Sequence, residues 1–243
     1  MNGMLGRFLS IAESTRAEAV LRRLAQHRID GWALTGGLAV GIHSIVTGLQ
    51  PYERSLSDLD FITERFEDVP KTLGKDFLFR HVHPGAQQGR TMMQLVDADA
   101  HLRIDLFHAV GATLRRATQI ELAAGTFTIV ALEDLMARTA RLLLDLASGL
   151  PVPAKHAADF LLLSAMLGSR DVQPAWRDHR KPDQPESFTE VTKILSMLIP
   201  KKRELLVIPE YSQDTQTKCD RCMQADSFPL ADPHAILAVL GYW

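Results

Sequence analysis

The stretch that decides the fold is residues 32–61, WALTGGLAVGIHSIVTGLQPYERSLSDLDF. It opens on a short apolar run, residues 32–35, which lies between glycines and predicts a buried strand. The pair Gly36-Gly37 then leads into residues 38–47, a small and apolar segment that is typical of a helix. After a polar connection, Asp58-Leu59-Asp60 begins a second predicted strand. Because side chains alternate along a strand, the two carboxylates are expected on one face.

A third carboxylate stands in the middle of a later strand-like run. Residues 102–107 read LRIDLF, with Asp105 at the centre. Two carboxylates at positions i and i+2 of a strand repel each other unless a proton or a cation intervenes. Mg²⁺ favours carboxylate and phosphate oxygens, and Mn²⁺ accepts similar ligands. If Asp105 joins Asp58 and Asp60, the three predict a site for one or two such cations.

The glycine pair suits the phosphate side of such a site. Backbone N–H groups at the start of a helix bind anions, and the absence of a Cβ allows a phosphate to approach closely. Each part also has a simpler interpretation. An Asp-x-Asp pair can be a solvated strand end, Asp105 can be a solvated residue of an alternating strand, and Gly36-Gly37 can be a plain turn. The order of the parts along the chain favours the metal site.

The remaining chain divides into strands followed by helices. An amphipathic helix is expected over residues 12–28, with Ser14 or Thr15 as its N-cap. The other predicted elements are a short helix at 67–73, an antiparallel meander of strands at 77–82, 91–96 and 102–107, a strand at 125–130, and helices at 131–147, 154–167 and 187–198. The polar, proline-containing segment 168–186 is predicted to be a loop.

This pattern predicts an α+β fold, a mixed sheet flanked by helices and followed by a helical C-terminal portion. We expect the boundary near residue 130, with an α/β portion at 1–130 and a helical portion at 131–243. Hydrophobic residues make up 46% and charged residues 23% of the chain, which is typical of globular proteins. The net charge of −2 argues against a general nucleic-acid binder.

Neither a membrane span nor a signal peptide is expected. No apolar run approaches the roughly 18 residues of a membrane-spanning helix, and the N-terminus soon becomes charged. We therefore expect a cytoplasmic protein.

Cys219 and Cys222 form a CxxC pair. The pair could be half of a zinc site or a redox pair, although two ordinary cysteines are the simpler interpretation.

The glycine pair, the helix, the Asp-x-Asp and the later carboxylate together resemble the nucleotidyltransferase superfamily of polymerase-beta type, and within it the AbiEii toxin-like group. The resemblance covers about residues 30–165. It implies a nucleotidyltransferase-like mixed sheet, with Gly36 and Gly37 at the triphosphate and Asp58, Asp60 and Asp105 at the metals. Twenty residues separate Gly37 from Asp58. This interval is longer than the family usually has, so residues 51–57 are expected to be an insertion.

The helical portion extends the resemblance. The AbiEii-like group carries a basic residue on the helix after the last strand, and then a Lys-Asp-x-x-Asp motif on the next helix. Arg138 stands where the group usually has a lysine. Lys155 and Asp159 match the second motif, but His156 replaces its first aspartate. The resemblance implies that Arg138 and Lys155 clamp a triphosphate, as charge-assisted contacts would. The alternative is that both are solvated charges on helix surfaces.

The resemblance implies an enzyme that moves a nucleoside monophosphate from an NTP to an acceptor hydroxyl, with Mg²⁺ and with release of pyrophosphate. The acceptor would be a tRNA, a protein side chain or a small molecule. The last of these would make the protein an adenylyltransferase of the antibiotic-resistance kind. The alternative is a catalytically inactive nucleotidyltransferase-like module that binds a nucleotide or a partner, such as an antitoxin in a toxin–antitoxin pair.

Overall fold

The structure is a computed structural model that describes residues 3–52, 55–83 and 92–208. A seven-stranded mixed sheet, with strand order β3-β4-β5-β2-β1-β7-β6, forms the centre of the fold. The strands of this sheet are β1 (Trp32–Thr35), β2 (Asp58–Thr63), β3 (Leu78–His83), β4 (Met92–Asp97), β5 (Leu102–His108), β6 (Thr118–Leu122) and β7 (Gly125–Ile129). A two-stranded sheet pairs β8 (Val152–Pro153) with β9 (Leu206–Val207).

Helices flank the large sheet and then make up the rest of the described chain. The α-helices are α1 (Ile11–Leu24), α2 (Gly36–Val46), α3 (Thr113–Arg116), α4 (Leu132–Leu143), α5 (Ala154–Leu167), α6 (Gln173–His179) and α7 (Phe188–Lys201). Short 3-10 helices are η1 (Met4–Arg7), η2 (Phe66–Asp68), η3 (Lys71–Lys75), η4 (Leu144–Ser148) and η5 (Arg203–Leu205). Among the described residues, none of these helices is both long and apolar enough to cross a bilayer.

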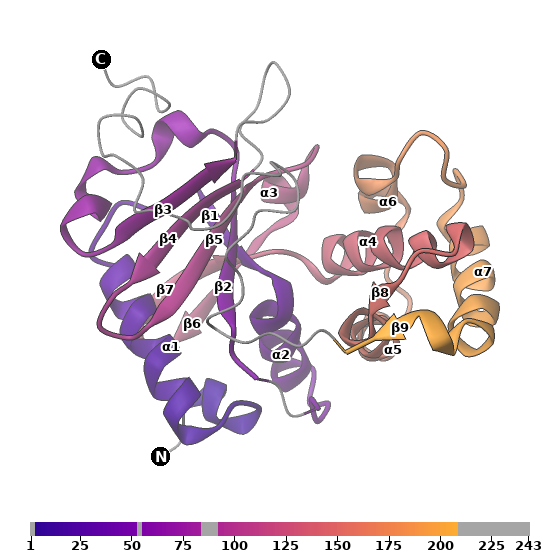
Figure 1. The fold of residues 1–243 in the computed structure, drawn as a ribbon, viewed down its shortest axis with the longest axis horizontal. Coiled ribbons are helices and arrows are strands. Elements are labelled where there is room, and N and C mark those ends of the chain that lie inside the picture. Colours follow the sequence, from indigo (N-terminus) through magenta and orange to yellow (C-terminus); the bar gives the residue numbers. More distant parts are fainter. Residues whose placement is uncertain (1–2, 53–54, 84–91, 209–243) are drawn as a thin grey trace.

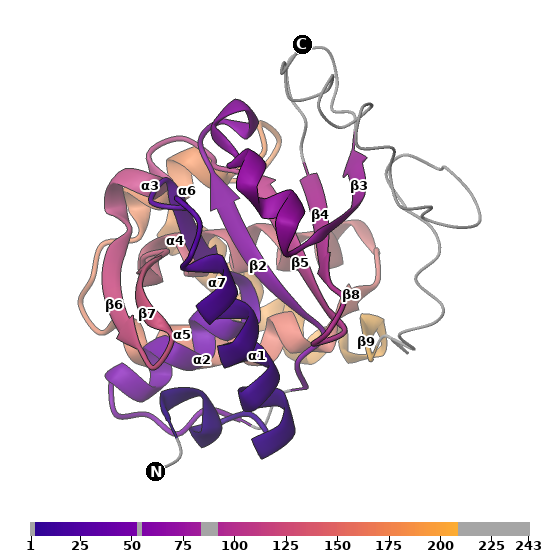
Figure 2. The same ribbon diagram turned by 90° about the vertical axis from the view of Figure 1, so that its left-hand side faces the viewer.

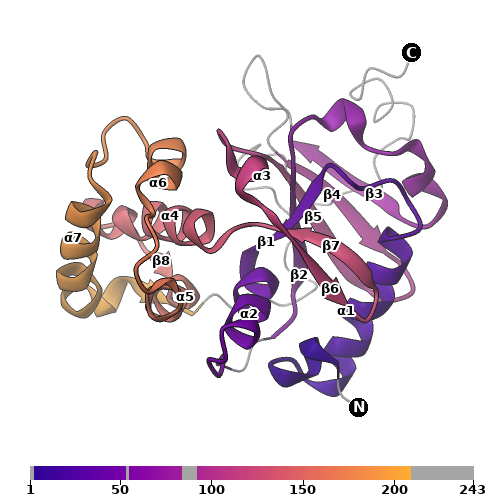
Figure 3. The ribbon, with the colours of Figure 1, turned by 180° about the vertical axis from the view of Figure 1, so that it is seen from behind.

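Helices pack against the large sheet. α1 lies across one face of the sheet (Figure 2) and packs against β5. α2 lies between the sheet and the group of helices α4–α7 (Figures 1 and 3). The buried apolar side chains form one contiguous cluster, which reaches from η1 to α7. The expected mixed sheet flanked by helices and followed by helices is therefore confirmed.

The strands nearest the centre are the ones with the clearest sequence signal. All four residues of β1 are buried, and the strand lies inside the sheet, between β2 and β7. β2 begins at Asp58, where the Asp-x-Asp pattern predicts it. β3, β4 and β5 form the expected antiparallel meander. Within the meander, β5 pairs in parallel with β2. This pairing places aspartates of β2 and β5 side by side on neighbouring strands.

Several predicted details are wrong. The N-cap of α1 is Ser10, not Ser14 or Thr15. Ser10 Oγ accepts from the backbone N–H of Glu13 at 3.3 Å, and the Glu13 carboxylate accepts from the Ser10 N–H at 3.2 Å. This is a capping box, which starts the helix four residues earlier than a cap at Ser14 would. α1 also ends at Leu24, before residue 28. The short helix predicted at 67–73 is two 3-10 turns, η2 and η3.

Two of the elements that were not predicted, β6 and α6, have clear physical reasons. β6 (Thr118–Leu122) is a mostly exposed edge strand, so its side chains carry little apolar alternation. α6 (Gln173–His179) lies inside the segment predicted to be a loop. Its proline, Pro174, stands in the first turn, where a missing N–H costs nothing. Trp176 of this helix is fully buried, which shows that tertiary packing fixes the helix despite its polar composition.

Candidate active site

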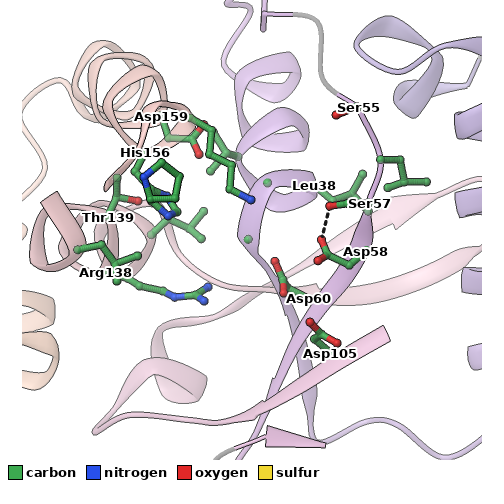
Figure 4. A pocket seen from close by; sticks show the side chains of 18 of the residues that line it. Leu38, Ser55, Ser57, Asp58, Asp60, Asp105, Arg138, Thr139, His156 and Asp159 are labelled. Atoms are coloured by element: carbon green, nitrogen blue, oxygen red, sulfur yellow. Dashed lines mark hydrogen bonds between the residues drawn. The ribbon is translucent and has the colours of Figure 1, made fainter. Parts of the chain in front are cut away.

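Three carboxylates converge at the centre of the sheet. In the parallel pairing of β2 with β5, Asp60 lies opposite Asp105, and Asp58 lies one pleat before Asp60 on the same face. One oxygen from each of Asp58, Asp60 and Asp105 lies within 4.8 Å of the others. Asp58 and Asp60 are half-buried, whereas Asp105 is only 5% exposed. Figure 4 shows the three side chains turned toward one another.

An arginine that was not among the predicted site residues holds this group together. Arg103 forms an ion pair with Asp58, and its Nε lies 3.0 Å from Asp105 Oδ1. Burial alone would lower the pKa of Arg103, but the charges of Asp105 and Asp58 outweigh it and raise the pKa. Its position two residues before Asp105 places it on the same face of β5, so strand alternation is the signal that could have found it.

Burial and mutual repulsion change the protonation of the carboxylates. Desolvation, followed by the charge of Asp58, raises the pKa of Asp60 to about 6, although Arg138 and Lys155 oppose this. Desolvation also raises the pKa of Asp105 to about 7. Arg103 lowers it and the charges of Asp60 and Asp58 raise it further. A cluster of this kind holds protons near neutral pH until a cation replaces them.

The donor set fits a hard divalent cation. All three ligands are carboxylates, which Mg²⁺ and Mn²⁺ prefer. Asp105 Oδ1 is buried, and its contact with Arg103 does not have hydrogen-bond geometry, so within the described chain it has no hydrogen-bond partner. A buried carboxylate oxygen that accepts no hydrogen bond and lies beside two further carboxylates is suited to bind a cation. Asp58, Asp60 and Asp105 would hold the cation.

The glycine pair forms the turn from β1 into α2 beside these carboxylates. Gly36 has φ +68°, a conformation that residues with a Cβ rarely adopt. A Cβ on Gly36 would lie 1.9 Å from Asp60 Oδ2, so glycine allows the carboxylate to lie against the backbone. The helix that follows spans 11 residues, and the Thr35 side chain does not cap it. Its first N–H groups are therefore not satisfied by that side chain, as a phosphate site requires.

Two cations reach the same pocket from the helical side. The pocket has a volume of about 420 Å³, and its lining includes Gly36, Gly37, Asp58, Asp60, Asp105, Arg138 and Lys155. Arg138 extends from α4 toward Asp60 and Asp105 (Figure 4). Its guanidinium lies 5.4 Å from the centre of the Phe107 ring, and Nη1 donates to Thr35 Oγ1 at 3.5 Å. Arg138 and Lys155 thus line the site and are not solely surface charges.

The connection between α2 and β2 also contributes to the pocket. Tyr52 Oη donates to Asp159 Oδ1 of α5 at 2.7 Å, so this connection is tied to the helix that carries Lys155. Ser57 Oγ donates to Asp58 Oδ1 at 3.0 Å (Figure 4). No motif in the sequence points to Tyr52 or Ser57, because the partner of Tyr52 lies on a helix distant in sequence and the partner of Ser57 is the adjacent Asp58. Cys219 and Cys222 lie outside the described residues.

Comparisons with known proteins add a limited similarity. No family model and no curated protein matches the chain. Among solved structures, the chain is similar to an antigenic nucleotidyltransferase-like protein from Paracoccidioides brasiliensis. That pair has a TM-score of 0.44 and 15% identity, and the match covers 82% of this chain and 92% of that one. It is also similar to JHP933 from Helicobacter pylori, with a TM-score of 0.39, 15% identity, and coverage of 81% and 95%. The AbiEii-like grouping is not tested by these structures and stays a prediction.

Proposed function

We propose that the chain is a metal-dependent nucleotidyltransferase. It transfers a nucleoside monophosphate from an NTP to an acceptor hydroxyl and releases pyrophosphate. The observation that carries the proposal is the convergence of Asp58, Asp60 and Asp105 within 4.8 Å, in one pocket with Gly36 and two cationic side chains. Carboxylates that serve only as solvated strand residues would stay apart, because their negative charges repel one another unless a cation or a proton intervenes.

In the proposed reaction, the acceptor oxygen bonds to the α-phosphorus and the bond from that phosphorus to the bridging oxygen of the pyrophosphate breaks. A bound Mg²⁺ or Mn²⁺ would neutralise the phosphates and stabilise the attacking and leaving oxygens. The backbone N–H groups at Gly36 and Gly37 hold phosphate oxygens at the start of α2. Arg138 and Lys155 neutralise the charge that develops on the departing pyrophosphate.

Asp105 has a second task in this scheme. It is the most buried of the three carboxylates, and in the metal-free protein its pKa is raised to about 7, mainly by desolvation. We propose that Asp105, besides binding the metal, receives the proton of the acceptor hydroxyl as that hydroxyl attacks. Asp58 and Asp60 are the other two metal ligands, so one face of the sheet supplies both the metal site and the base.

The test is transfer of label from α-³²P-labelled NTPs, each offered with Mg²⁺ or Mn²⁺ and with three acceptors: bulk tRNA, a panel of small polyhydroxylated molecules, and the protein itself. We expect transfer that requires the metal and that is lost, by about a thousandfold or more, in Asp58→Asn and in Asp60→Asn. Both variants should keep the wild-type circular dichroism spectrum. Asp68→Asn, at an exposed aspartate that does not line the pocket, is the control that should keep full activity.

Full transfer by either active-site variant at saturating metal would contradict the assignment. Calorimetric binding of an NTP without transfer to any of the three acceptors would instead support the nucleotide-binding module. If tRNA accepts the label, its binding should weaken strongly with added salt, because phosphate contacts release counterions.

A further inference from the structure

A buried glutamine stands beside Asp105, on β4, the strand next to β5 in the sheet. In the antiparallel pairing of β4 with β5, Gln94 lies opposite Asp105, and Asp105 in turn lies opposite Asp60. Residues directly opposite on neighbouring strands point to the same face, with Cβ atoms about 4.5–5.5 Å apart. The register therefore forms a polar row, Asp60, Asp105 and Gln94, across three strands.

The Gln94 side chain faces Asp105 across the pair of strands. Gln94 lowers the pKa of Asp105, as a hydrogen bond that favours the charged form does. A carboxylate accepts hydrogen bonds, so the amide NH₂ of Gln94 is the donor. Arg103 approaches Asp105 from its own strand at 3.0 Å. The Asp105 carboxylate thus lies between Gln94 on β4 and the guanidinium of Arg103 on β5.

Packing alone does not explain a glutamine at this position. Gln94 is only 7% exposed, and within the described chain its Oε1 is buried without a hydrogen-bond partner. A buried amide oxygen without a partner destabilises a fold, whereas an aliphatic side chain of similar volume avoids that loss. Its neighbours on the same strand, Met93 and Leu95, are fully buried and apolar. The amide stands opposite Asp105, a candidate metal ligand.

We propose that Gln94 is a positioning residue that holds the Asp105 carboxylate in its metal-binding orientation. This inference rests on the proposed function, since it concerns the same metal site. Partners that orient a metal ligand affect both metal affinity and activity, typically by about 10–100-fold when they are removed. The role is specific to the amide, because its NH₂ is the only group of this side chain that can donate to a carboxylate.

The experiment compares Gln94→Leu with wild type in three measurements. Binding of Mn²⁺ to the protein without nucleotide is followed by the electron paramagnetic resonance signal of free Mn²⁺. Transfer from the labelled NTP gives kcat and the NTP KM, and thermal unfolding of the metal-free protein gives Tm. For Gln94→Leu we expect a Kd for Mn²⁺ about 10–100-fold higher and a kcat lower by a similar factor. The NTP KM should stay within about twofold, and Tm should be unchanged or higher, because a buried polar group is removed.

Two variants complete the design. Met92→Leu is the matched control, since Met92 stands on the same face of β4 and lies opposite Phe107, not opposite a carboxylate. It should behave as wild type in all three measurements. Gln94→Met keeps the unbranched length of the side chain without its amide, and it replaces Gln94→Leu if the branched side chain prevents folding.

The outcomes separate the inference from the function. Wild-type Mn²⁺ affinity and kcat in the Gln94 variants would overturn the positioning role and leave the nucleotidyltransferase proposal standing. A lower Tm with unchanged Mn²⁺ affinity would assign Gln94 a purely structural role, which also overturns the inference. Wild-type protein that neither binds Mn²⁺ nor transfers label would remove both proposals together.

Discussion

At the scale of single residues, the carboxylate cluster is a group of acids that folding drives toward protonation. Burial raises the pKa of Asp60 to about 6 and that of Asp105 to about 7, and the neighbouring carboxylates add to both effects. A divalent cation binds the ionised forms, so it must displace these protons. The affinity of the site for metal is therefore tied to pH in the neutral range, where isolated aspartates no longer titrate.

We predict that Mn²⁺ affinity rises at least tenfold between pH 5.5 and pH 8, because up to two protons leave as the metal binds. Mn²⁺ titrations at four pH values measure the affinity, and calorimetry in buffers of different ionisation enthalpy measures the protons released. Asp105→Asn removes one of the two raised groups and should give a shallower profile. A flat wild-type profile would contradict this account of the site.

The same raised pKa values fix how the stability of the metal-free protein varies with pH. A carboxyl whose pKa is higher in the folded state than in the unfolded state stabilises the fold below the unfolded pKa and loses that contribution as pH rises. For Asp60 and Asp105 the loss falls between about pH 4 and pH 7. Saturating Mn²⁺ should therefore raise Tm more at pH 8 than at pH 5.5, which scanning calorimetry would detect.

At the scale of elements, the sequence predicts those parts whose signal is local. β1, β2 and α5 begin where the pattern places them, because an apolar run, an Asp-x-Asp alternation and a continuous helical period are each contained in one segment. α6 was missed because it depends on the burial of Trp176 against other helices. The three aspartates were found from type and order, and strand alternation around Asp105 could also have found Arg103, whereas Gln94 required the register of β4 with β5, which no local pattern encodes.

The junction of β1 with α2 depends on the absence of a side chain at Gly36. We predict that Gly36→Ala lowers the free energy of unfolding by about 1–2 kcal/mol, because alanine is strained at φ +68°. The new Cβ would also displace Asp60, whose Oδ2 lies 1.9 Å from its position, so Mn²⁺ affinity and transfer should both fall. Urea unfolding and Mn²⁺ titration measure the two effects.

Gly31→Ala is the matched control for this prediction. A Cβ on Gly31, which lies just before β1, would meet nothing within 4 Å, so stability and metal affinity should stay close to wild type. If Gly36→Ala retained the wild-type Mn²⁺ affinity, the close approach of Asp60 to the backbone would have no part in metal binding.

At the scale of the whole molecule, one ionic network joins the sheet to the helices that complete the pocket. Arg116 of α3, which lies between β5 and β6, donates to both oxygens of Asp134 on α4 at 2.7 Å. It also pairs with Asp178 of α6 at 2.7 Å, and His179 Nε2 lies 3.0 Å from Asp134 Oδ1. Asp134 stands one helical turn before Arg138, so the network sets where α4 presents Arg138 to the carboxylates.

The division into portions 1–130 and 131–243 stays a prediction, and this network would couple the two.

We predict that Arg116→Leu lowers the free energy of unfolding at pH 7 by about 3–5 kcal/mol, because it leaves the fully buried Asp134 carboxylate without its main partner. The NTP KM should rise as α4 and Arg138 lose their fixed position. Urea unfolding and the labelled-NTP assay measure these effects. Arg170→Leu is the matched control. Arg170 pairs with Glu133 of α4 at an exposed site, so we expect this variant to lower the free energy of unfolding by only about 0–1 kcal/mol.

The pH dependence of this network runs opposite to that of the metal site. Burial alone would raise the pKa of Asp134, but hydrogen bonds from Arg116 and His179 lower it to about 2. A depressed carboxyl pKa stabilises the fold above about pH 4, and the contribution is lost as pH falls from there toward 2. The difference in stability between wild type and Arg116→Leu should therefore shrink as the pH is lowered through that interval.

The double variant Arg116→Leu/Asp134→Asn, which removes the unpaired charge, should recover part of the loss at pH 7. Equal stability of Arg116→Leu and wild type at pH 7 would show that α4 is held by its apolar contacts alone.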